Sequence, residues 1–122
     1  MLTKDTVLYR KAFAFAVRVV RLHRFLVNEK KKFVLSKQLL RSGTSIGANI
    51  SEANGAISSR DFSSKISIAY KESLETKCWL SLLKETGFIT EKAFSSLHND
   101  ADELSKILFS VLKTTRLKPS SN

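Results

Sequence analysis

The sequence has little of what turns, disulfides and strand-rich folds require. Its 122 residues include one proline, four glycines and one cysteine. Scarce proline and glycine suit long helices joined by short turns much better than a fold of many short strands. A single cysteine excludes an internal disulfide, and Cys78, which lies beside Trp79 within a helical pattern, is predicted to be a small reduced core residue. We therefore expect an all-α protein of the cytoplasm.

Long hydrophobic runs are also missing. The apolar run at residues 12–17 is interrupted by Arg18, so it is too short for a signal peptide or a membrane span. A chain of this length buries about two thirds of its unfolded surface and forms one domain. We expect that domain at residues 1–117, followed by a disordered tail at residues 118–122.

Acidic residues are scarce in relation to basic ones. The chain has 21 lysines and arginines but 11 aspartates and glutamates, which gives a net charge of +10. Nine of the basic residues and only two of the acidic ones lie within residues 1–35. A positive field concentrated in this way attracts polyanions, whether nucleic acid, an anionic membrane or an acidic protein.

Apolar periodicity and capping residues predict four helices. The first runs from about residue 6 to residue 28, and the second from near Ser36, a good cap, to about residue 56. The third begins at Ser58 or Ser59, where Ser58 and Asp61 have the spacing of a capping box, and ends at Gly87. Thr90 caps the fourth. The short connections predict an antiparallel up-down-up-down four-helix bundle.

The third and fourth helices each carry an apolar seam at alternating spacings of three and four residues. The seam residues are Phe62, Ile66, Ala69, Ser73, Thr76, Leu80 and Leu83 in the third helix, and Phe94, Leu97, Ala101, Leu104, Leu108 and Val111 in the fourth. Further apolar residues fall off these seams, and self-association would cover them. They are Ile68, Cys78, Trp79, Leu82, Ile107, Phe109 and Leu112.

The first helix separates into an apolar face and a cationic face. The predicted nucleic-acid-binding residues are Arg10, Lys11, Arg18, Arg21 and Arg24, with Lys30, Lys31 and Lys32 at the end of the helix. Phe25, and more marginally Val17, fall on the cationic side, which indicates a subunit contact or a base-stacking surface. The alternative is a solvated face with one stray phenylalanine.

The second helix carries two glycines on its apolar face, Gly43 and Gly47. Glycine inside a helix costs about 1 kcal/mol relative to alanine, so we expect close approach of another backbone to offset it. A polar ladder on the opposite face is placed for a partner helix or a neighbouring chain. Its members are Arg41, Ser45, Asn49 and Glu52.

Residues 38–53, QLLRSGTSIGANISEA, carry a family resemblance together with motifs of the third helix. Those motifs are Asp61-Phe62, the run KISIA at 65–69, Lys71-Glu72, Glu75-Thr76, Trp79-Leu80 and Leu82-Leu83. The chain resembles the four-helix bundle proteins encoded in intervening sequences of bacterial 23S ribosomal RNA genes, which are similar in turn to accessory subunits of diversity-generating retroelements. The resemblance covers about half of the chain and implies a cyclic homopentamer with a basic surface that binds structured RNA or DNA.

No motif of known catalytic chemistry stands out. His23 and His98 lack the Glu-x-x-His spacing of a di-iron bundle. Ser81 and Lys84 have a Ser-x-x-Lys spacing without the companion motifs of a serine nucleophile. Glu72 and Glu75 are predicted to form helix ion pairs or subunit contacts, since Lys71 and Lys77 are nearby. We expect no catalytic residue, no metal and no cofactor.

The sequence thus favours a non-enzymatic oligomeric bundle that binds phosphate backbones through its first helix. The alternative is a protein-interaction scaffold that docks an acidic partner such as a reverse transcriptase. A further alternative is a protein that lies on anionic membrane surfaces, which an amphipathic first helix permits.

Overall fold

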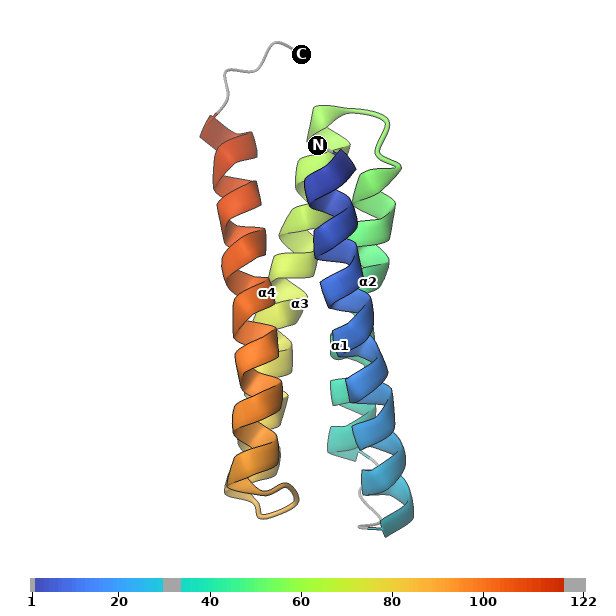
Figure 1. The fold of residues 1–122 in the computed structure, drawn as a ribbon, viewed down its shortest axis with the longest axis vertical. Coiled ribbons are helices and arrows are strands. Elements are labelled where there is room, and N and C mark those ends of the chain that lie inside the picture. The colour runs from blue at the N-terminus through green and yellow to red at the C-terminus, as the bar shows by residue number, and fades with distance from the viewer. Residues whose placement is uncertain (1, 30–33, 118–122) are drawn as a thin grey trace.

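The computed structural model describes residues 2–29 and 34–117, and side chains within 7–29 and 34–115. Four helices account for most of the described chain. They are α1 (Leu2–Glu29), α2 (Val34–Asn54), α3 (Ser59–Glu85) and α4 (Glu91–Leu117). Successive helices run antiparallel, and the described residues contain no strand (Figure 1). The prediction of an all-α up-down-up-down bundle is confirmed. The predicted tail at 118–122 lies outside the described residues.

The predicted caps of α3 and α4 are confirmed. The Ser58 hydroxyl accepts a hydrogen bond from the Asp61 amide at 3.0 Å, and the Thr90 hydroxyl accepts one from the Ala93 amide at 3.1 Å. Each bond satisfies an amide that has no partner within its helix. Gly87 follows α3 with a φ of 81°, a conformation that favours glycine. Local chemistry therefore fixes both ends of the turn between α3 and α4.

The prediction that Ser36 caps α2 is wrong. The helix starts at Val34, and Ser36 lies within it, fully buried, instead of capping it. The carbonyl oxygen of Ser36 lies 3.2 Å from Nδ1 of His23, a residue of α1. Ser36 is thus a small residue at the α1–α2 contact, and this tertiary position outweighs its preference for a cap. The first helix also starts earlier than predicted, at Leu2.

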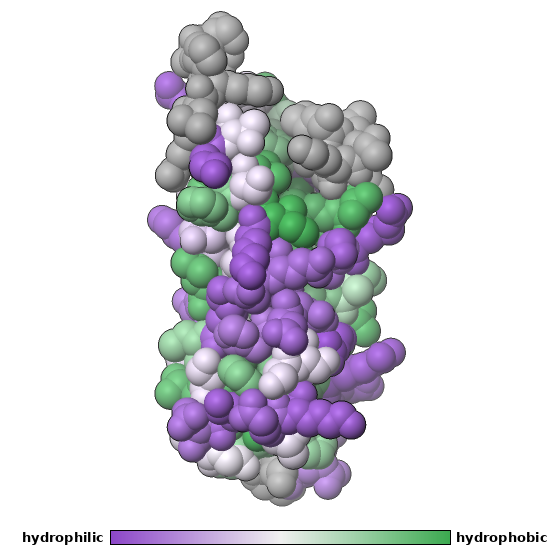
Figure 2. Space-filling model, turned by 60° about the vertical axis from the view of Figure 1, so that its left-hand side comes forward, coloured by the Kyte–Doolittle hydropathy of each residue, from purple (hydrophilic) through white to green (hydrophobic). Residues whose placement is uncertain are grey.

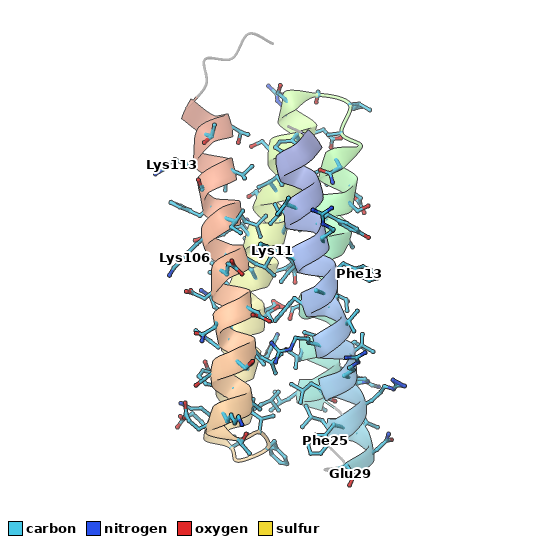
Figure 3. The ribbon with its side chains drawn as sticks, in the orientation of Figure 1. Lys11, Phe13, Phe25, Glu29, Lys106 and Lys113 are labelled. Carbon is cyan, nitrogen blue, oxygen red and sulfur yellow. The ribbon has the colours of Figure 1, made fainter. Side chains whose placement is uncertain are left out.

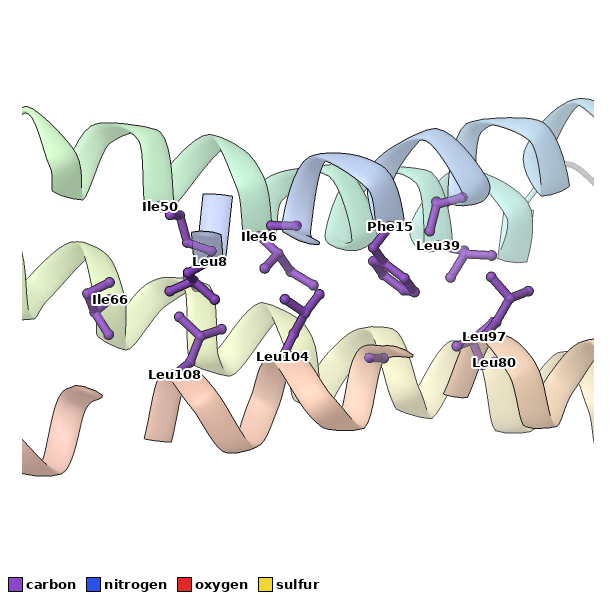
Figure 4. Packing of buried hydrophobic residues seen from close by; sticks show 14 of the residues in the cluster. Leu8, Phe15, Leu39, Ile46, Ile50, Ile66, Leu80, Leu97, Leu104 and Leu108 are labelled. Carbon is purple, nitrogen blue, oxygen red and sulfur yellow. The ribbon is translucent and has the colours of Figure 1, made fainter. Parts of the chain in front are cut away.

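The core lies between all four helices. Each of the seven predicted seam residues of α3 is buried, and Figure 4 shows Ile66 and Leu80 facing side chains from the other helices. In α4, Leu97, Ala101, Leu104 and Leu108 are buried as predicted, whereas Phe94 and Val111 are partly exposed. Leu112, predicted to lie off the seam, is buried as well. Periodicity therefore located most of the core.

Two pairs of buried hydroxyls cross the core. The hydroxyl oxygens of Ser73 and Ser105 lie 2.7 Å apart and join α3 to α4. Those of Thr76 and Ser42 lie 3.0 Å apart and join α3 to α2. All four side chains are buried, so the pairs satisfy groups that water does not reach.

The bundle is less closed on one side than on the others. α2 packs along α1 and α3, and α3 packs along α4, but α1 and α4 approach each other less closely (Figure 1). Figure 2 shows hydrophilic side chains gathered across the middle of the face that α4 and α1 share. Polar groups therefore contribute much of the contact between α1 and α4.

Cys78 is not the core residue that the sequence predicted. It is exposed on α3, as are Leu74 and Leu82, one turn away on either side. Residues four apart lie on the same side of a helix, so the three share an outward stripe. Trp79 is only partly buried, although its indole nitrogen is enclosed without a hydrogen-bond partner in the described structure.

Candidate nucleic-acid interface

The predicted cationic face of α1 divides into a paired side and an unpaired side. On the paired side, Lys11 Nζ lies 3.2 Å from Glu103 Oε2. The Arg18 guanidinium lies 2.6 Å from Asp100 Oδ2 and donates to the Ser96 hydroxyl at 2.9 Å. Lys11 accordingly extends from α1 toward α4 in Figure 3. These two cations hold α4 beside α1.

The unpaired side consists of Arg10, Arg21 and Arg24. All three side chains are exposed, and none forms an ion pair with a residue of the described chain. The remaining predicted residues, Lys30, Lys31 and Lys32, lie outside the described residues. Arg10, Arg21 and Arg24 are therefore the described part of the predicted interface whose charge is not offset within the chain.

The carboxylates of the described chain are mostly engaged in internal contacts. Beyond the two pairs with α1, the ion pairs join Glu52 to Lys65, Glu72 and Glu75 to Arg41, Glu85 and Glu91 to Lys84, and Asp102 to Lys77 and Lys106. The Asp61 carboxylate accepts a hydrogen bond from the backbone amide of Ile57, and Glu29 is exposed at the end of α1. Cations are thus in excess on the outer surface, where Lys37, Arg60, Lys71, Lys92 and Lys113 have no carboxylate partner among the described residues.

Two aromatic rings lie among the unpaired arginines. Phe25 is 44% exposed, which confirms that it falls outside the core. Phe13 is 56% exposed, and the sequence pattern alone did not single it out. At 100° per residue, Phe13 falls beside Arg24 and Arg10 on the helix circumference, and this position was the signal that could have found it.

The glycines of α2 face α1 of the same chain. A Cβ atom on Gly43 would lie 2.8 and 2.9 Å from the two methyl carbons of Val19. A Cβ atom on Gly47 would meet the Ala12 Cβ at 3.7 Å, an ordinary van der Waals distance. The close approach of α1 to α2 is therefore real, but it is tightest at Gly43.

Two members of the polar ladder of α2, Arg41 and Glu52, contact α3. Arg41 binds the carboxylates of Glu72, at 3.2 Å, and Glu75. Glu52 accepts from Lys65 at 2.9 Å, and this hydrogen bond, together with the negative charge, raises the pKa of Lys65 above its ordinary value. Between them, the Asn49 amide nitrogen donates to the carbonyl and hydroxyl oxygens of Ser45, at 2.9 and 3.0 Å. Arg41 and Glu52 therefore have their partners on a helix of the same chain.

The glutamates and histidines considered for catalysis make structural contacts in the described ranges. Glu72 and Glu75 are both bound by Arg41, which favours the structural role that the sequence assigned to them. His23 contacts a backbone carbonyl, and the ring of His98 packs against Phe94 with centroids 5.0 Å apart. Within 2–29 and 34–117, no group of three or more histidine, cysteine, aspartate or glutamate side chains could hold a metal ion. A helix able to cross a lipid bilayer is likewise not found there.

The fold and surface together define a small antiparallel four-helix bundle with unpaired cations on its first helix. Comparison with known families assigns it further. The chain belongs to the 23S rRNA-intervening sequence protein family, whose sequence profile matches residues 4–110. The family resemblance seen in the sequence is thereby confirmed.

A solved structure agrees with this assignment. It is the crystal structure of a protein of unknown function from the S23 ribosomal protein family of Bacteroides thetaiotaomicron. The two proteins are 55% identical, with a TM-score of 0.88, over 90% of this chain and 98% of the other. No protein with a curated description matches this chain.

Proposed function

We propose that this protein is a non-enzymatic nucleic-acid-binding bundle whose α1 outer face contacts the phosphate backbone of RNA or DNA. The observation that carries the proposal is the exposure of Arg10, Arg21 and Arg24 without carboxylate partners in the described chain. Guanidinium groups bind phosphate oxygens through two parallel hydrogen bonds, so free arginines on one helix form a suitable surface. The name of the family, which refers to ribosomal RNA, is consistent with this partner.

The proposed partner is recognised by charge and shape. The described helices contain no recognition helix of a helix-turn-helix motif and no strand platform of the kind that reads bases in RNA-binding sheets. Phosphate contacts fix position and carry no sequence information directly. We therefore expect broad binding to structured RNA and DNA that weakens steeply with salt.

The test replaces the three free arginines together. Arg10→Gln, Arg21→Gln and Arg24→Gln should weaken retention of a structured RNA and reduce the salt slope by about one for each phosphate that the protein no longer binds. The matched control, Lys71→Gln, Lys92→Gln and Lys113→Gln, removes the same charge from α3 and α4. Equal losses of affinity in both variants would contradict a specific role for α1 and leave only the effect of net charge.

Arg18 belongs to the sequence-predicted set but is a poor residue for this test. Its guanidinium binds Asp100 and Ser96, so its removal also disturbs the contact between α1 and α4. A variant at this position would confuse loss of binding with loss of structure. The unpaired arginines avoid that ambiguity.

The proposal includes self-association. Ile68, Leu74 and Leu82 are each about two fifths exposed on α3, where a monomer would leave them in water. The family resemblance implies five copies in a ring, which would multiply the positive field. Light scattering at high salt measures the mass without polyanions, and a monomer mass there contradicts this part of the proposal.

An acidic protein partner is the alternative occupant of the α1 outer face. Nuclease treatment separates the two partners: an assembly held by nucleic acid disappears, whereas a direct contact with an acidic protein survives. Survival of every α1-dependent assembly after nuclease treatment would overturn the nucleic-acid proposal.

A further inference from the structure

The outward face of α1 combines exposed aromatic rings with unpaired arginines. Phe13 and Phe25 are the two most exposed aromatic side chains of this helix. Figure 3 shows Phe13 projecting away from the bundle and Phe25 near the far end of α1. Phosphate binding alone would be served by the arginines and gives no reason for water-exposed phenyl rings beside them.

Each ring has an arginine as its neighbour on the helix surface. Arg10 precedes Phe13 by three residues and Arg21 precedes Phe25 by four, the two spacings that bring side chains together. Arg24 completes the same face between the rings. Each phenyl ring can therefore contact an uncharged group of a ligand while the adjacent arginine binds a negative charge next to that group.

The Phe13 ring also contacts a second aromatic ring of α1. Its ring centroid lies 6.0 Å from that of Tyr9, with the rings tilted by 39°. Tyr9 is partly buried and packs against the core. Contact with a ring anchored in this way restricts the motion of Phe13 before any ligand arrives, which lowers the entropy cost of binding to it.

We propose that this face binds single-stranded nucleic acid, with Phe13 and Phe25 stacking on unpaired bases and the arginines binding the phosphates between them. This inference rests on the proposed nucleic-acid binding. Bases of a duplex are stacked on one another and hide their faces, whereas a single strand exposes them to protein aromatics. The two rings are 12 residues apart, about 18 Å along the helix axis, so a short single strand spans them.

The inference refines the expected substrate. Unpaired loops, bulges and ends of a folded RNA present both a phosphate backbone and free base faces. Stacking on phenyl rings tolerates every base, so this contact adds affinity for single strands without reading a particular sequence. The protein should therefore prefer unpaired segments within structured RNA over uniform duplex.

The experiment compares a labelled single-stranded oligonucleotide of about 12 nucleotides, within the range of known single-strand site sizes, with its duplex. The variant Phe13→Leu/Phe25→Leu removes both rings but keeps apolar side chains and good helix formers. Fluorescence anisotropy should show single-strand affinity reduced by about tenfold or more, because two bases lose the rings on which they stack. Duplex affinity should stay unchanged.

The matched control is Phe109→Leu on α4. Phe109 is 49% exposed, contacts Tyr70 and lies far from the free arginines in sequence. Its substitution should leave both affinities unchanged. Circular dichroism and thermal unfolding of the natural protein and both variants test whether the leucine variants keep the fold.

The possible outcomes distinguish failure of base stacking from failure of the proposed nucleic-acid binding. Duplex binding with no effect of the leucine variant on single-strand affinity would overturn the stacking inference and keep phosphate binding. No binding to either oligonucleotide at low salt would overturn both. A lower oligomer mass for the leucine variant in light scattering would assign the rings to a contact with a second copy, and would also overturn the inference.

Discussion

Gly43 and Gly47 lie one turn apart on α2 and face the same helix, but they differ in the space that a side chain would find. At Gly43, an added Cβ would lie within 3 Å of two methyl carbons of Val19. Valine is branched at Cβ and has little rotamer freedom in a helix, so it cannot easily move aside. At Gly47 the nearest atom, the Ala12 Cβ, is 3.7 Å away.

Alanine should therefore have opposite effects at the two positions. We expect Gly43→Ala to lower the free energy of unfolding by about 1–3 kcal/mol because of overpacking. Gly47→Ala should raise it by up to about 1 kcal/mol, since alanine is the better helix former. Urea denaturation measures both values.

A double variant checks the cause. Val19→Ala removes both methyl groups that an alanine at position 43 would meet, so the pair Val19→Ala/Gly43→Ala should cost less than the sum of the single changes. Additive costs would mean that Gly43 is required for some reason other than Val19.

Asp102 gives a prediction for acid unfolding. Hydrogen bonds from Lys106, at 3.0 Å, and Lys77, at 3.1 Å, hold the pKa of Asp102 below its usual 3.8. A lowered folded-state pKa stabilises the protein above the unfolded value, and this contribution is lost as the pH falls through the folded value. The stability difference between the natural protein and Asp102→Asn should thus shrink below about pH 3.8, and a difference that stays constant in acid would contradict this origin.

Single residues were predictable where their chemistry is local. Ser58 and Thr90 bind amides three residues away, so the sequence around each of them defines the cap. Ser36 has the same chemistry, but its place against α1 decided its role. Cys78 was wrongly predicted to lie in the core, and the exposure of Phe13 was not predicted. The exposure of each depends on which helices flank its own helix.

At the level of helices, the ion pairs between α1 and α4 offset the charge of two cations of α1. Asp100 binds Arg18, and Glu103 binds Lys11, across the side of the bundle where the helices are farthest apart. These side chains remain substantially exposed, and such pairs contribute about 0–1 kcal/mol to stability each. Their larger effect is on the charge that α1 presents.

Removing these carboxylates should therefore strengthen polyanion binding. We expect Asp100→Asn/Glu103→Gln to raise RNA affinity at low salt, because it releases Lys11 and Arg18 for phosphate while reducing stability only slightly. Fluorescence anisotropy with the natural protein as reference measures the gain. The control Glu52→Gln/Asp102→Asn raises net charge equally but releases lysines of α3 and α4 instead of cations of α1. An equal gain from it would show that position on α1 is unimportant.

The helices themselves were easier to predict than their pairing. The seam of α3 repeats regularly over the whole helix, and all seven of its residues are buried. The pairs formed by Lys11 and Arg18 join residues 92 and 82 positions apart, so they depend on the register between α1 and α4. Lys11 and Arg18 are seven residues apart and share one edge of the cationic face. Nothing within α1 shows that the carboxylates of α4 lie along that edge.

On the scale of the whole molecule, α3 carries exposed apolar side chains on its outer face, opposite to its buried seam. Leu74, Cys78 and Leu82 form an outward stripe on it, with Ile68 nearby in sequence. Under the self-association proposal, this surface is covered by another copy of the chain.

Charge placed on this stripe should reduce the oligomer mass. Leu74→Glu/Leu82→Glu introduces two carboxylates that a subunit contact would have to desolvate, so we expect a smaller species in light scattering with helical content unchanged. The control Asn99→Glu/Ser110→Glu adds the same charge to exposed positions of α4. An unchanged mass in the stripe variant would place the subunit contact elsewhere.

The topology of the whole bundle followed from its short connections, because helices joined by few residues must lie antiparallel. The wider separation of α1 and α4 could not be predicted from the sequence. Apolar periodicity shows which residues of each helix are inside, but the distance between two helices depends on the size of the side chains between them, such as Gly43 against Val19.

The hydroxyl pairs Ser73–Ser105 and Thr76–Ser42 have a consequence for alignment. A purely aliphatic interior tolerates sliding of one helix along another, since leucine meets leucine again after a turn. A buried hydroxyl that moves away from its partner loses its hydrogen bond where water cannot replace it, at a cost of about 1–3 kcal/mol. The two pairs therefore fix α3 lengthwise against both of its neighbours, and a chain that carried alanine at all four positions should lose this single alignment before it loses its helices.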